Sequence, residues 1–415
     1  MYRKIKVCRI CGNKNLVSLI DLGRLSLTGV FPQNSREKIG KGPLRLVKCD
    51  EKNGKSCGLV QLEHNYNLDI LYGDNYGYRS GLNSSMVKHL QNKVKKICKI
   101  VNLKSGDLVM DIGSNDATLL KAYPQGKFQL VGIDPTGEKF RNHYINNIQL
   151  VADFFPSKLL NKTIGKKKAK IITSIAMFYD LENPMSFMQS IYNTLDDNGV
   201  WVLEQSYMPS MLAANAYDTI CHEHLEYYSL KQIKFMTDQV GLKIIDIEFN
   251  SINGGSFSVT VAKKESGYKE NTDEIERILT EEKRKRLHTL LPYIKFNKNI
   301  KKHKKNLLIF LKKAKKEKAT IFGYGASTKG NVILQYCGLS KKDIPYIAEV
   351  NEYKFGRVTP GTHIPIISEA EAKKMNPNYF MVLPWHFKEN IVQRELKYIK
   401  NGGRLFFPLP KLEII

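Results

Sequence analysis

Short runs of β-branched and other apolar residues alternate with helical stretches through the middle of this chain of 415 residues. The five runs are "DLVMDIG", "FQLVGID", "IQLVA", "AKIITSIA" and "GVWVLEQ". Such alternation is typical of a parallel, doubly wound sheet with helices on both faces. Two later runs, "LKIIDIEF" and "SFSVTVA", are separated only by "NSINGG", which predicts an antiparallel hairpin at one edge. The fold class we expect is therefore α/β.

A second α/β pattern follows near the C-terminus. "KATIFGYGASTKGNVILQY" predicts a strand, a glycine turn and a helix, and three further apolar runs come after it. Between the two patterns lies a helical stretch interrupted by Pro292. We expect four segments: a small N-terminal module at 1–75, the first α/β domain at 76–265, a helical connector at 266–317 and a Rossmann-like domain at 318–415.

Four of the seven cysteines lie in the N-terminal segment. Cys8 and Cys11 have the spacing of a zinc knuckle, whereas Cys49 and Cys57 are farther apart than the usual second pair. A segment this small has too few apolar residues to hold itself together, and structural Zn²⁺ on four thiolates would supply the missing stability. A set of reduced, half-buried thiols is the alternative.

The net charge of +25 raises the possibility of a nucleic-acid binder. The excess is spread along the chain, and its densest run places Ile300, Leu307, Leu308 and Leu311 at helical spacing, so we interpret its lysines as the solvated face of an amphipathic helix. A basic surface favours an anionic small molecule, such as a nucleotide diphosphate, over nucleic acid. The absence of a long apolar run and of a signal peptide predicts a cytoplasmic protein without a membrane partner.

The first strand leads into a glycine turn and a predicted helix start in "DIGSNDATLL". Asp111 stands at the strand end and Gly113 allows the tight turn, while Asp134 ends the next strand, where a carboxylate accepts ribose hydroxyls. An acid at the first strand end suits a sulfonium and an ammonium better than a pyrophosphate, so S-adenosylmethionine is favoured over NAD. An ordinary strand-to-helix turn is the alternative.

Together with the terminal hairpin, this turn predicts the sheet of a class I methyltransferase. Further candidate cofactor residues stand in the turn or after the second, third and fourth strands: Asn115, Asp116, Pro135, Asp153, Phe154, Ser174 and Met177.

The segment from Asn215 to Ser229, "NAYDTICHEHLEYYS", concentrates proton-handling side chains. His222 and His224 alternate, so on a strand they would share a face. A metal site and ordinary hydrogen-bonded structural histidines are both alternatives to a catalytic role.

In order along the chain, the four thiols, "CGLVQL", "YGYRSG", "DIGSND", "CHEHLEYYS", "NGGS", "FGYGASTKGN", "GRVTPGTHIPI" and "VLPWHF" resemble the C-methyltransferases of deoxysugar biosynthesis. The resemblance covers nearly the whole chain. It implies an N-terminal zinc module, a central S-adenosylmethionine domain and a C-terminal Rossmann-like domain around a nucleotide-linked keto sugar. We expect a monomer or a small homo-oligomer.

The resemblance also implies roles for particular residues. His224 matches the family's base, with Glu223 beside it to orient the ring and His222 in the same candidate site. Tyr76 or Tyr78 matches the substrate-binding tyrosine. The residues implied for the nucleotide sugar, of which Lys329 also stands in an anion-holding glycine loop, are Lys329, Arg357 and His386.

Two positions depart from the family pattern. Cys221 stands where tyrosine is frequent, and Ala117 replaces the glycine usual after "SND", a change that a helix start tolerates. The first departure keeps open an O- or N-methyltransferase on a related sugar nucleotide. An NAD-dependent oxidoreductase or epimerase, and a zinc-containing nucleic-acid binder, are further alternatives.

Overall fold

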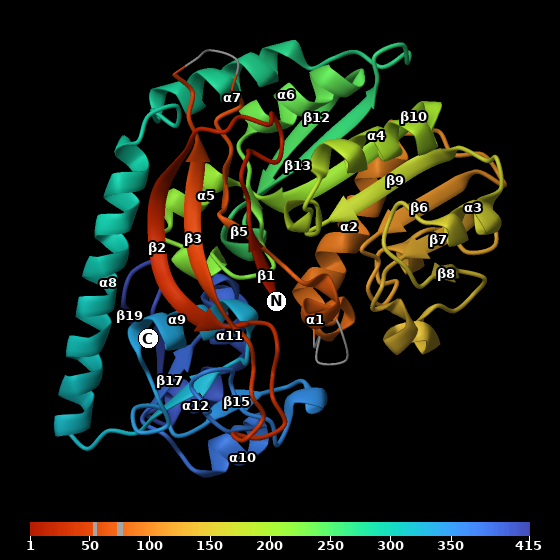
Figure 1. Ribbon diagram of the computed structural model, residues 1–415. Coiled ribbons are helices and arrows are strands. Elements are labelled where there is room, and N and C mark those ends of the chain that lie inside the picture. Colours follow the sequence, from red (N-terminus) through yellow and green to blue (C-terminus); the bar gives the residue numbers. More distant parts are fainter. Residues whose placement is uncertain (53–55, 73–77) are drawn as a thin grey trace.

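The computed structural model describes residues 1–52, 56–72 and 78–415. The strands form three larger β-sheets and a separate two-stranded pair (Figure 1). Tyr76 lies outside the described residues. The proposed division into four segments stays a prediction.

The central sheet has seven strands in the order β12-β13-β10-β9-β6-β7-β8. The five strands from β6 to β10 pair in parallel, and β13 pairs antiparallel with both β10 and β12, which confirms the expected parallel sheet closed by a hairpin. The strands are β6 (Leu108–Ile112), β7 (Gln129–Ile133), β8 (Gln149–Val151), β9 (Ala169–Ile175), β10 (Leu195–Ser206), β12 (Leu242–Asn250) and β13 (Ser256–Lys263). This is the order of a class I methyltransferase sheet.

Helices cover both faces of the central sheet. Helix α2 (Ser84–Ile100) packs on one face through an apolar stripe, and α4 (Pro184–Thr194) and α6 (Leu230–Val240) pack on the other. Asn83 caps α2 by accepting a hydrogen bond from the Ser85 amide at 3.0 Å.

The predicted α-helix after the glycine turn is wrong. A 3-10 turn at Leu120–Ala122 stands there instead. Asn115 and Ala117 have φ of 50° and 58°, in the left-handed region that a right-handed helix cannot include, and Pro124 follows shortly after. The Ala117 departure therefore sits at a position where glycine would be relaxed, not at a tolerant helix start.

The N-terminal sheet is antiparallel, in the order β11-β4-β3-β2. Its members are β2 (Leu16–Ser26), β3 (Lys41–Cys49), β4 (Val60–Leu62) and β11 (Glu226–Tyr227), and a separate pair joins β1 (Tyr2–Lys4) to β5 (His64–Tyr66). Strand β11 belongs to the histidine segment, residues 215–229. The segment that carries His222 and His224 therefore supplies the edge strand of a sheet built from the first 62 residues.

The C-terminal sheet has the order β16-β15-β14-β17-β18-β19 and is parallel except for its last pair. Its strands are β14 (Ile321–Tyr324), β15 (Ile347–Glu349), β16 (Ile366–Ser368), β17 (Tyr379–Val382), β18 (Arg404–Phe407) and β19 (Glu413–Ile414). Helix α9 (Thr328–Cys337) follows the glycine loop after β14. The shorter helices are α1 (Leu68–Leu71), α3 (Lys158–Ile164), α5 (Met208–Ala213), α10 (Glu369–Lys374), α11 (Lys388–Arg394) and α12 (Leu396–Lys400).

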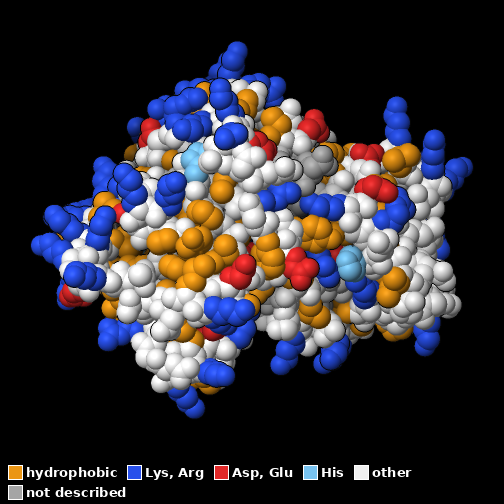
Figure 2. Space-filling model, turned by 90° about the horizontal axis from the view of Figure 1, so that it is seen from below, with side chains coloured by type: hydrophobic (Ala, Val, Ile, Leu, Met, Phe, Trp, Pro, Cys, Tyr) orange, Lys and Arg blue, Asp and Glu red, His pale blue; other side chains and the backbone are white. Residues whose placement is uncertain are grey.

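The connector forms two helices, α7 (Thr272–Arg284) and α8 (Leu291–Lys316), and α8 runs along β2 toward the C-terminal sheet (Figure 1). Ile300, Leu307 and Leu311 are buried as expected, whereas Leu308 is exposed. The lysines of α8 thus form a solvated face. Lys and Arg side chains are spread over the face shown in Figure 2 and form no single stripe there.

The hydrophobic cores cross the boundaries between the sheets. One core joins the N-terminal sheet, the histidine segment, α8 and the C-terminal sheet. Another joins three of the four clustered cysteines to one face of the central sheet. Among the described helices, none is long and apolar enough to cross a membrane.

Glu282 of α7 fastens the connector to the start of α6. It is buried, and its carboxylate accepts hydrogen bonds from the Tyr207 hydroxyl at 2.7 Å and from the Leu230 and Lys231 amides at 2.7 and 3.2 Å. Glu282→Ala leaves these donors without an acceptor, and we expect it to lower the free energy of unfolding by about 3 kcal/mol in urea titrations. Glu281→Ala, at an exposed neighbouring position, is the control and should cost less than about 1 kcal/mol.

Candidate functional site

The glycine turn, residues 111–116, joins the end of β6 to the second and fourth strands. Gly113 has φ of 76°, and a Cβ there would lie 3.0 Å from Met177 Cγ, so the turn needs glycine for both conformation and space. Asp111 is buried, and its carboxylate accepts a hydrogen bond from Thr173 Oγ1 at 2.6 Å. Burial raises the pKa of Asp111 to about 7, while the Thr173 hydroxyl opposes the shift and Asp134 adds to it.

Asp134 holds the turn from the end of β7. Its Oδ2 accepts from the Asn115 amide at 2.8 Å, and its Oδ1 accepts from the amide and hydroxyl of Thr136, at 2.7 and 2.6 Å. Pro135 lies between Asp134 and Thr136 in the sequence. A carboxylate has about four acceptor positions, so one remains for a ribose hydroxyl rather than the two that the sequence suggested. The residues present fit an adenosine cofactor bearing an ammonium group.

The segment around Tyr78 lies against the glycine turn. Asn115 Nδ2 donates to the Tyr78 carbonyl at 3.2 Å, and the Asp116 carboxylate accepts from the Gly81 amide and Arg79 Nε at 3.0 and 3.2 Å. The Tyr78 side chain is half exposed. Asp116 therefore anchors this segment, whereas the sequence suggested that it faces the cofactor.

The other cofactor candidates differ in their surroundings. The Asp153 carboxylate accepts from the Phe154 amide and from the Ser157 hydroxyl, and the Phe154 ring is exposed at the surface. Ser174 is completely buried and accepts from Trp201 Nε1 at 3.1 Å, so its hydroxyl faces the core.

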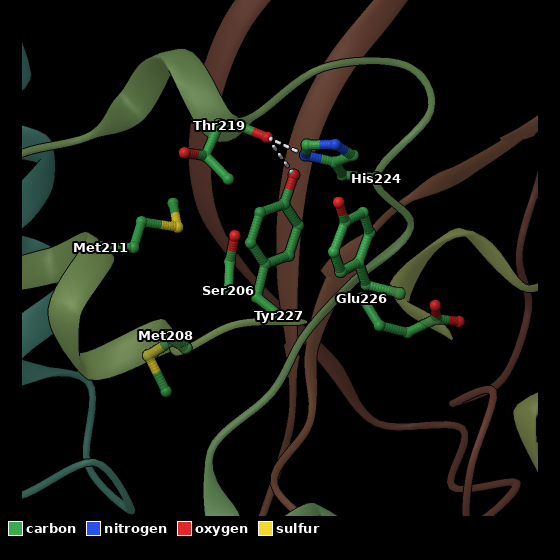
Figure 3. A pocket seen from close by; sticks show the side chains of 8 residues that line it. Ser206, Met208, Met211, Thr219, His224, Glu226 and Tyr227 are labelled. Carbon is green, nitrogen blue, oxygen red and sulfur yellow. Dashed lines mark hydrogen bonds between the residues drawn. The ribbon is translucent and has the colours of Figure 1, made fainter. Parts of the chain in front are cut away.

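His224 is partly buried beside a small cavity (Figure 3). Its Nδ1 lies 2.8 Å from the Thr219 carbonyl, toward which the Tyr227 hydroxyl also points. Because a carbonyl only accepts, Nδ1 carries the proton and Nε2 carries the lone pair. Burial and the Lys329 cation lower the pKa of His224 to about 3, against the opposing hydrogen bond to Thr219, so the ring is neutral at neutral pH.

His222 and Glu223 point to a different part of the chain. The Thr28 amide donates to His222 Nδ1 at 3.3 Å, the ring is completely buried, and burial lowers its pKa to about 3. The Thr28 hydroxyl lies 3.4 Å from Glu223 Oε2, and a Cβ on Gly29 would lie 2.0 Å from Glu223 Oε1. His222 thus packs against the N-terminal module, and the Thr219 carbonyl, rather than Glu223, orients the His224 ring.

Lys329 lies where the histidine segment meets the C-terminal glycine loop. Its Nζ donates to the Asn253 carbonyl at 3.1 Å, and its cation lowers the pKa values of both His224 and His386. Asp218 opposes the effect of burial on Lys329 and accepts from Trp385 Nε1 at 2.8 Å. His224, Lys329 and His386 are therefore brought together, with His386 Nδ1 unpartnered among the described residues.

Arg357 is placed elsewhere. Its Nη1 donates to the Phe31 carbonyl at 2.9 Å and its Nε to the Tyr353 carbonyl at 2.9 Å, so the guanidinium holds the N-terminal module against the C-terminal domain. Cys221 is completely buried, and burial raises the pKa of its thiol. It packs in the shared core.

The four N-terminal cysteines meet in space. All four sulfur atoms lie within 4.8 Å of one another, with 3.5 Å between Cys8 and Cys57 and between Cys11 and Cys49. Sulfurs on a tetrahedral zinc lie about 3.8 Å apart, so the long spacing between Cys49 and Cys57 does not prevent a four-thiolate site.

Sequence reasoning missed the contacts that orient the histidine segment. Thr28 and Gly29 stand nearly 200 residues before it, in a loop without a recognisable motif. The Thr219 carbonyl is a backbone group and leaves no signal in the sequence. Asp218 belongs to the histidine segment, but its partner Trp385 lies far away in the sequence, so the sequence does not reveal this hydrogen bond.

Three family models match successive parts of the chain and together cover almost all of it. Their descriptions are "Putative zinc binding domain" at residues 8–72, "Methyltransferase domain" at 86–247 and "C-methyltransferase C-terminal domain" at 251–410. The chain belongs to the S-adenosylmethionine-dependent C-methyltransferases. It is similar to the C-methyltransferase NovU of Streptomyces niveus, with 26% identity over 100% of this chain and 97% of that protein.

Two solved methyltransferase structures are similar to a part of the C-methyltransferase. An S-adenosylmethionine-dependent methyltransferase of Clostridium acetobutylicum shares 13% identity over 43% of this chain and 92% of its own, with a TM-score of 0.33. The plantazolicin methyltransferase BpumL, solved with SAH, shares 11% identity over 42% of this chain and 82% of its own, with a TM-score of 0.34.

The raised pKa of Asp111 sets a testable pH dependence. A carboxyl protonated more readily in the folded state favours folding at low pH, and that stability is lost as the pH rises through about 7. Asp111→Asn should therefore stabilise the cofactor-free protein by about 2 to 4 kcal/mol at pH 8 and by nearly nothing at pH 4. Urea unfolding across this range measures the effect, and a gain that does not depend on pH would contradict it.

Proposed function

We propose that this C-methyltransferase moves a methyl group from S-adenosylmethionine to a carbon beside the ketone of a nucleotide-linked keto-deoxysugar, with His224 as the base. The observation that carries the proposal is the tautomer of His224, whose Nδ1–H is held by the Thr219 carbonyl and whose Nε2 keeps its lone pair. A neutral, oriented imidazole of this kind can accept a proton from carbon.

The carbon nucleophile is made by proton removal. His224 Nε2 takes the proton, and the electron pair of the broken C–H bond moves onto the carbonyl oxygen to give an enolate. The Lys329 cation, which lowers the pKa of His224, would stabilise the negative charge on the enolate oxygen. The hydroxyl of Tyr76 or Tyr78 is a candidate donor to the same oxygen, because the backbone of Tyr78 is tied to Asn115 of the glycine turn.

An anionic substrate would make His224 a stronger base. A diphosphate beside Lys329 offsets the cation that lowers the pKa of His224, so basicity would rise when the substrate binds. His386 and the glycine loop before α9 complete the proposed anion site. We leave Arg357 out of it because its guanidinium already donates to backbone carbonyls.

The proposed cofactor residues are those of the glycine turn and the neighbouring strand ends. Asp111 would face the ammonium group, Asp134 the ribose, and Gly113 with Met177 would line the space between them. When bound, S-adenosylmethionine supplies a methyl group on a sulfonium. The basic, thiol-containing chain also suits a reducing cytoplasm, which is our proposal for its location.

His224→Gln tests the proposed base. The amide cannot accept the proton, so methyl transfer and solvent deuterium exchange at the carbon beside the ketone should fall by at least about a thousandfold. A panel of nucleotide-linked 4-keto-6-deoxy sugars supplies the substrates, and calorimetry should show unchanged binding of S-adenosylhomocysteine. His288→Gln, an exposed histidine, is the control. Wild-type turnover in His224→Gln would refute the assignment.

We also propose that the cysteine cluster holds one structural Zn²⁺, which the distances between the four sulfurs support. Elemental analysis should find about one zinc per chain. Cys49→Ser should lose the metal and several degrees of melting temperature, because metal binding contributes directly to folding. Cys98→Ser, at an exposed thiol outside the cluster, should keep both. A metal-free wild-type protein of unchanged stability would contradict the proposal.

A further inference from the structure

Arg9 stands between the first two clustered cysteines, and its side chain is only 2% exposed. Its Nη1 donates to the Leu62 carbonyl at 2.8 Å and to Gln61 Oε1 at 3.2 Å, and its Nη2 donates to the His64 carbonyl at 3.4 Å and to the Asn65 side chain. The guanidinium therefore spans β4 and β5. Such a planar group fixes the relative position of its acceptors, which a lysine could not do.

The same guanidinium reaches the histidine segment. Its Nη1 lies 3.5 Å from the Leu225 carbonyl, and its Nε lies 3.6 Å from Glu226 Oε1, with the Glu226 side chain completely buried. Neither carboxylate oxygen of Glu226 has a hydrogen-bond partner among the described residues. Burial raises the pKa of Glu226 and the Arg9 cation opposes that rise, so Arg9 favours the charged form of this carboxyl. Glu226 lines the cavity beside His224 and Tyr227 (Figure 3).

Backbone hydrogen bonds hold strand β11 at both ends, because the Leu225 amide donates to the Tyr179 carbonyl and the Met208 amide to the Tyr228 carbonyl, both at 2.8 Å. The strand pairs with β4 over two residues, Glu226 with Gln61 and Tyr227 with Val60, and the Leu62 amide donates to the Leu225 carbonyl at 2.8 Å. A strand this short is marginal by itself. Arg9 contacts both β4 and the residues entering β11, so it braces this pairing from the cysteine side.

We propose that Arg9 is a positioning residue for catalysis: through Glu226 and β11 it sets the place of the His224 ring. The cysteine cluster fixes the backbone on both sides of Arg9. The cluster would therefore affect the reaction, through the Arg9 side chain, as well as the stability of the protein. The proposal rests on the assignment of His224 as the base. Its structural half, that Arg9 orders residues 219–229, does not depend on that assignment.

Arg9→Met tests the proposal in the zinc-loaded protein. It removes the fork of donors and leaves the Glu226 carboxylate without its compensating charge. A displacement of about 1 Å in a catalytic group costs about a hundredfold in rate, so kcat should fall by about that factor with the wild-type protein's best substrate from the panel. The KM for S-adenosylmethionine should not change, because the glycine turn lies on β6, outside these contacts. Amide hydrogen exchange of residues 219–229, measured without substrate, should accelerate at least about tenfold.

Two further variants keep the test decisive. Arg3→Met removes another arginine of the module, one whose ion pair with Glu182 is exposed, and should behave as wild type. Glu226→Gln keeps the shape of its side chain and removes the carboxyl that pairs with Arg9, so it should lower kcat and accelerate the same exchange even if Arg9→Met folds poorly. Zinc content and binding of S-adenosylhomocysteine are measured on each variant.

Wild-type kcat and wild-type exchange in both Arg9→Met and Glu226→Gln, with zinc retained, would overturn the proposal. Failure of the proposed function looks different, because His224→Gln would then remain active whatever Arg9→Met does. Faster exchange in Arg9→Met with unchanged kcat would show that Arg9 orders the segment without positioning the base, which also overturns the proposal.

Discussion

The two-residue pairing of β4 with β11 is the contact on which the arrangement of this protein depends. It attaches the histidine segment, which belongs to the central α/β part, to a sheet made from the first residues of the chain. Once β11 is fixed, His222 lies against Thr28 and Glu223 against Gly29. The loop at 26–32 is then buried between this segment and α9, where Asn331 and Gln335 donate to its carbonyls.

Burial dominates the electrostatics at this centre. Desolvation raises the pKa values of Asp180, Glu223 and Glu226 and lowers those of His222, His224 and Lys329. Burial thus drives carboxyls and bases alike toward their neutral forms, and at Glu226 the Arg9 cation opposes this shift. In such surroundings an anion that binds beside Lys329 has a large effect on the pKa values of the neighbouring groups, because little water is present to screen its charge. The proposed substrate would therefore change the charge state of the centre by binding to it.

The central sheet could be predicted from the sequence because its strands are short β-branched runs whose parallel pairing follows from alternation with helices. Gly113 was recognisable because only glycine suits that turn, and the four cysteines because their chemistry is specific. The roles of neighbours in "HEH" could not be separated, since the His222 ring is directed by Thr28, far away in the sequence, and the His224 ring by a backbone carbonyl. Asp116 and Arg357 looked like ligand residues, yet their partners lie in segments that only the fold brings near.

The burial of residues 26–32 has a consequence for synthesis on the ribosome. Their partners include Gln335, Arg357 and Val358, which are made more than 300 residues later. The N-terminal module therefore cannot reach its final packing while the middle of the chain is being translated, although domains generally fold in order from the N-terminus. Its apolar loop must stay uncovered until nearly the whole polypeptide has emerged, and during that interval a nascent chain would be a natural client for a chaperone.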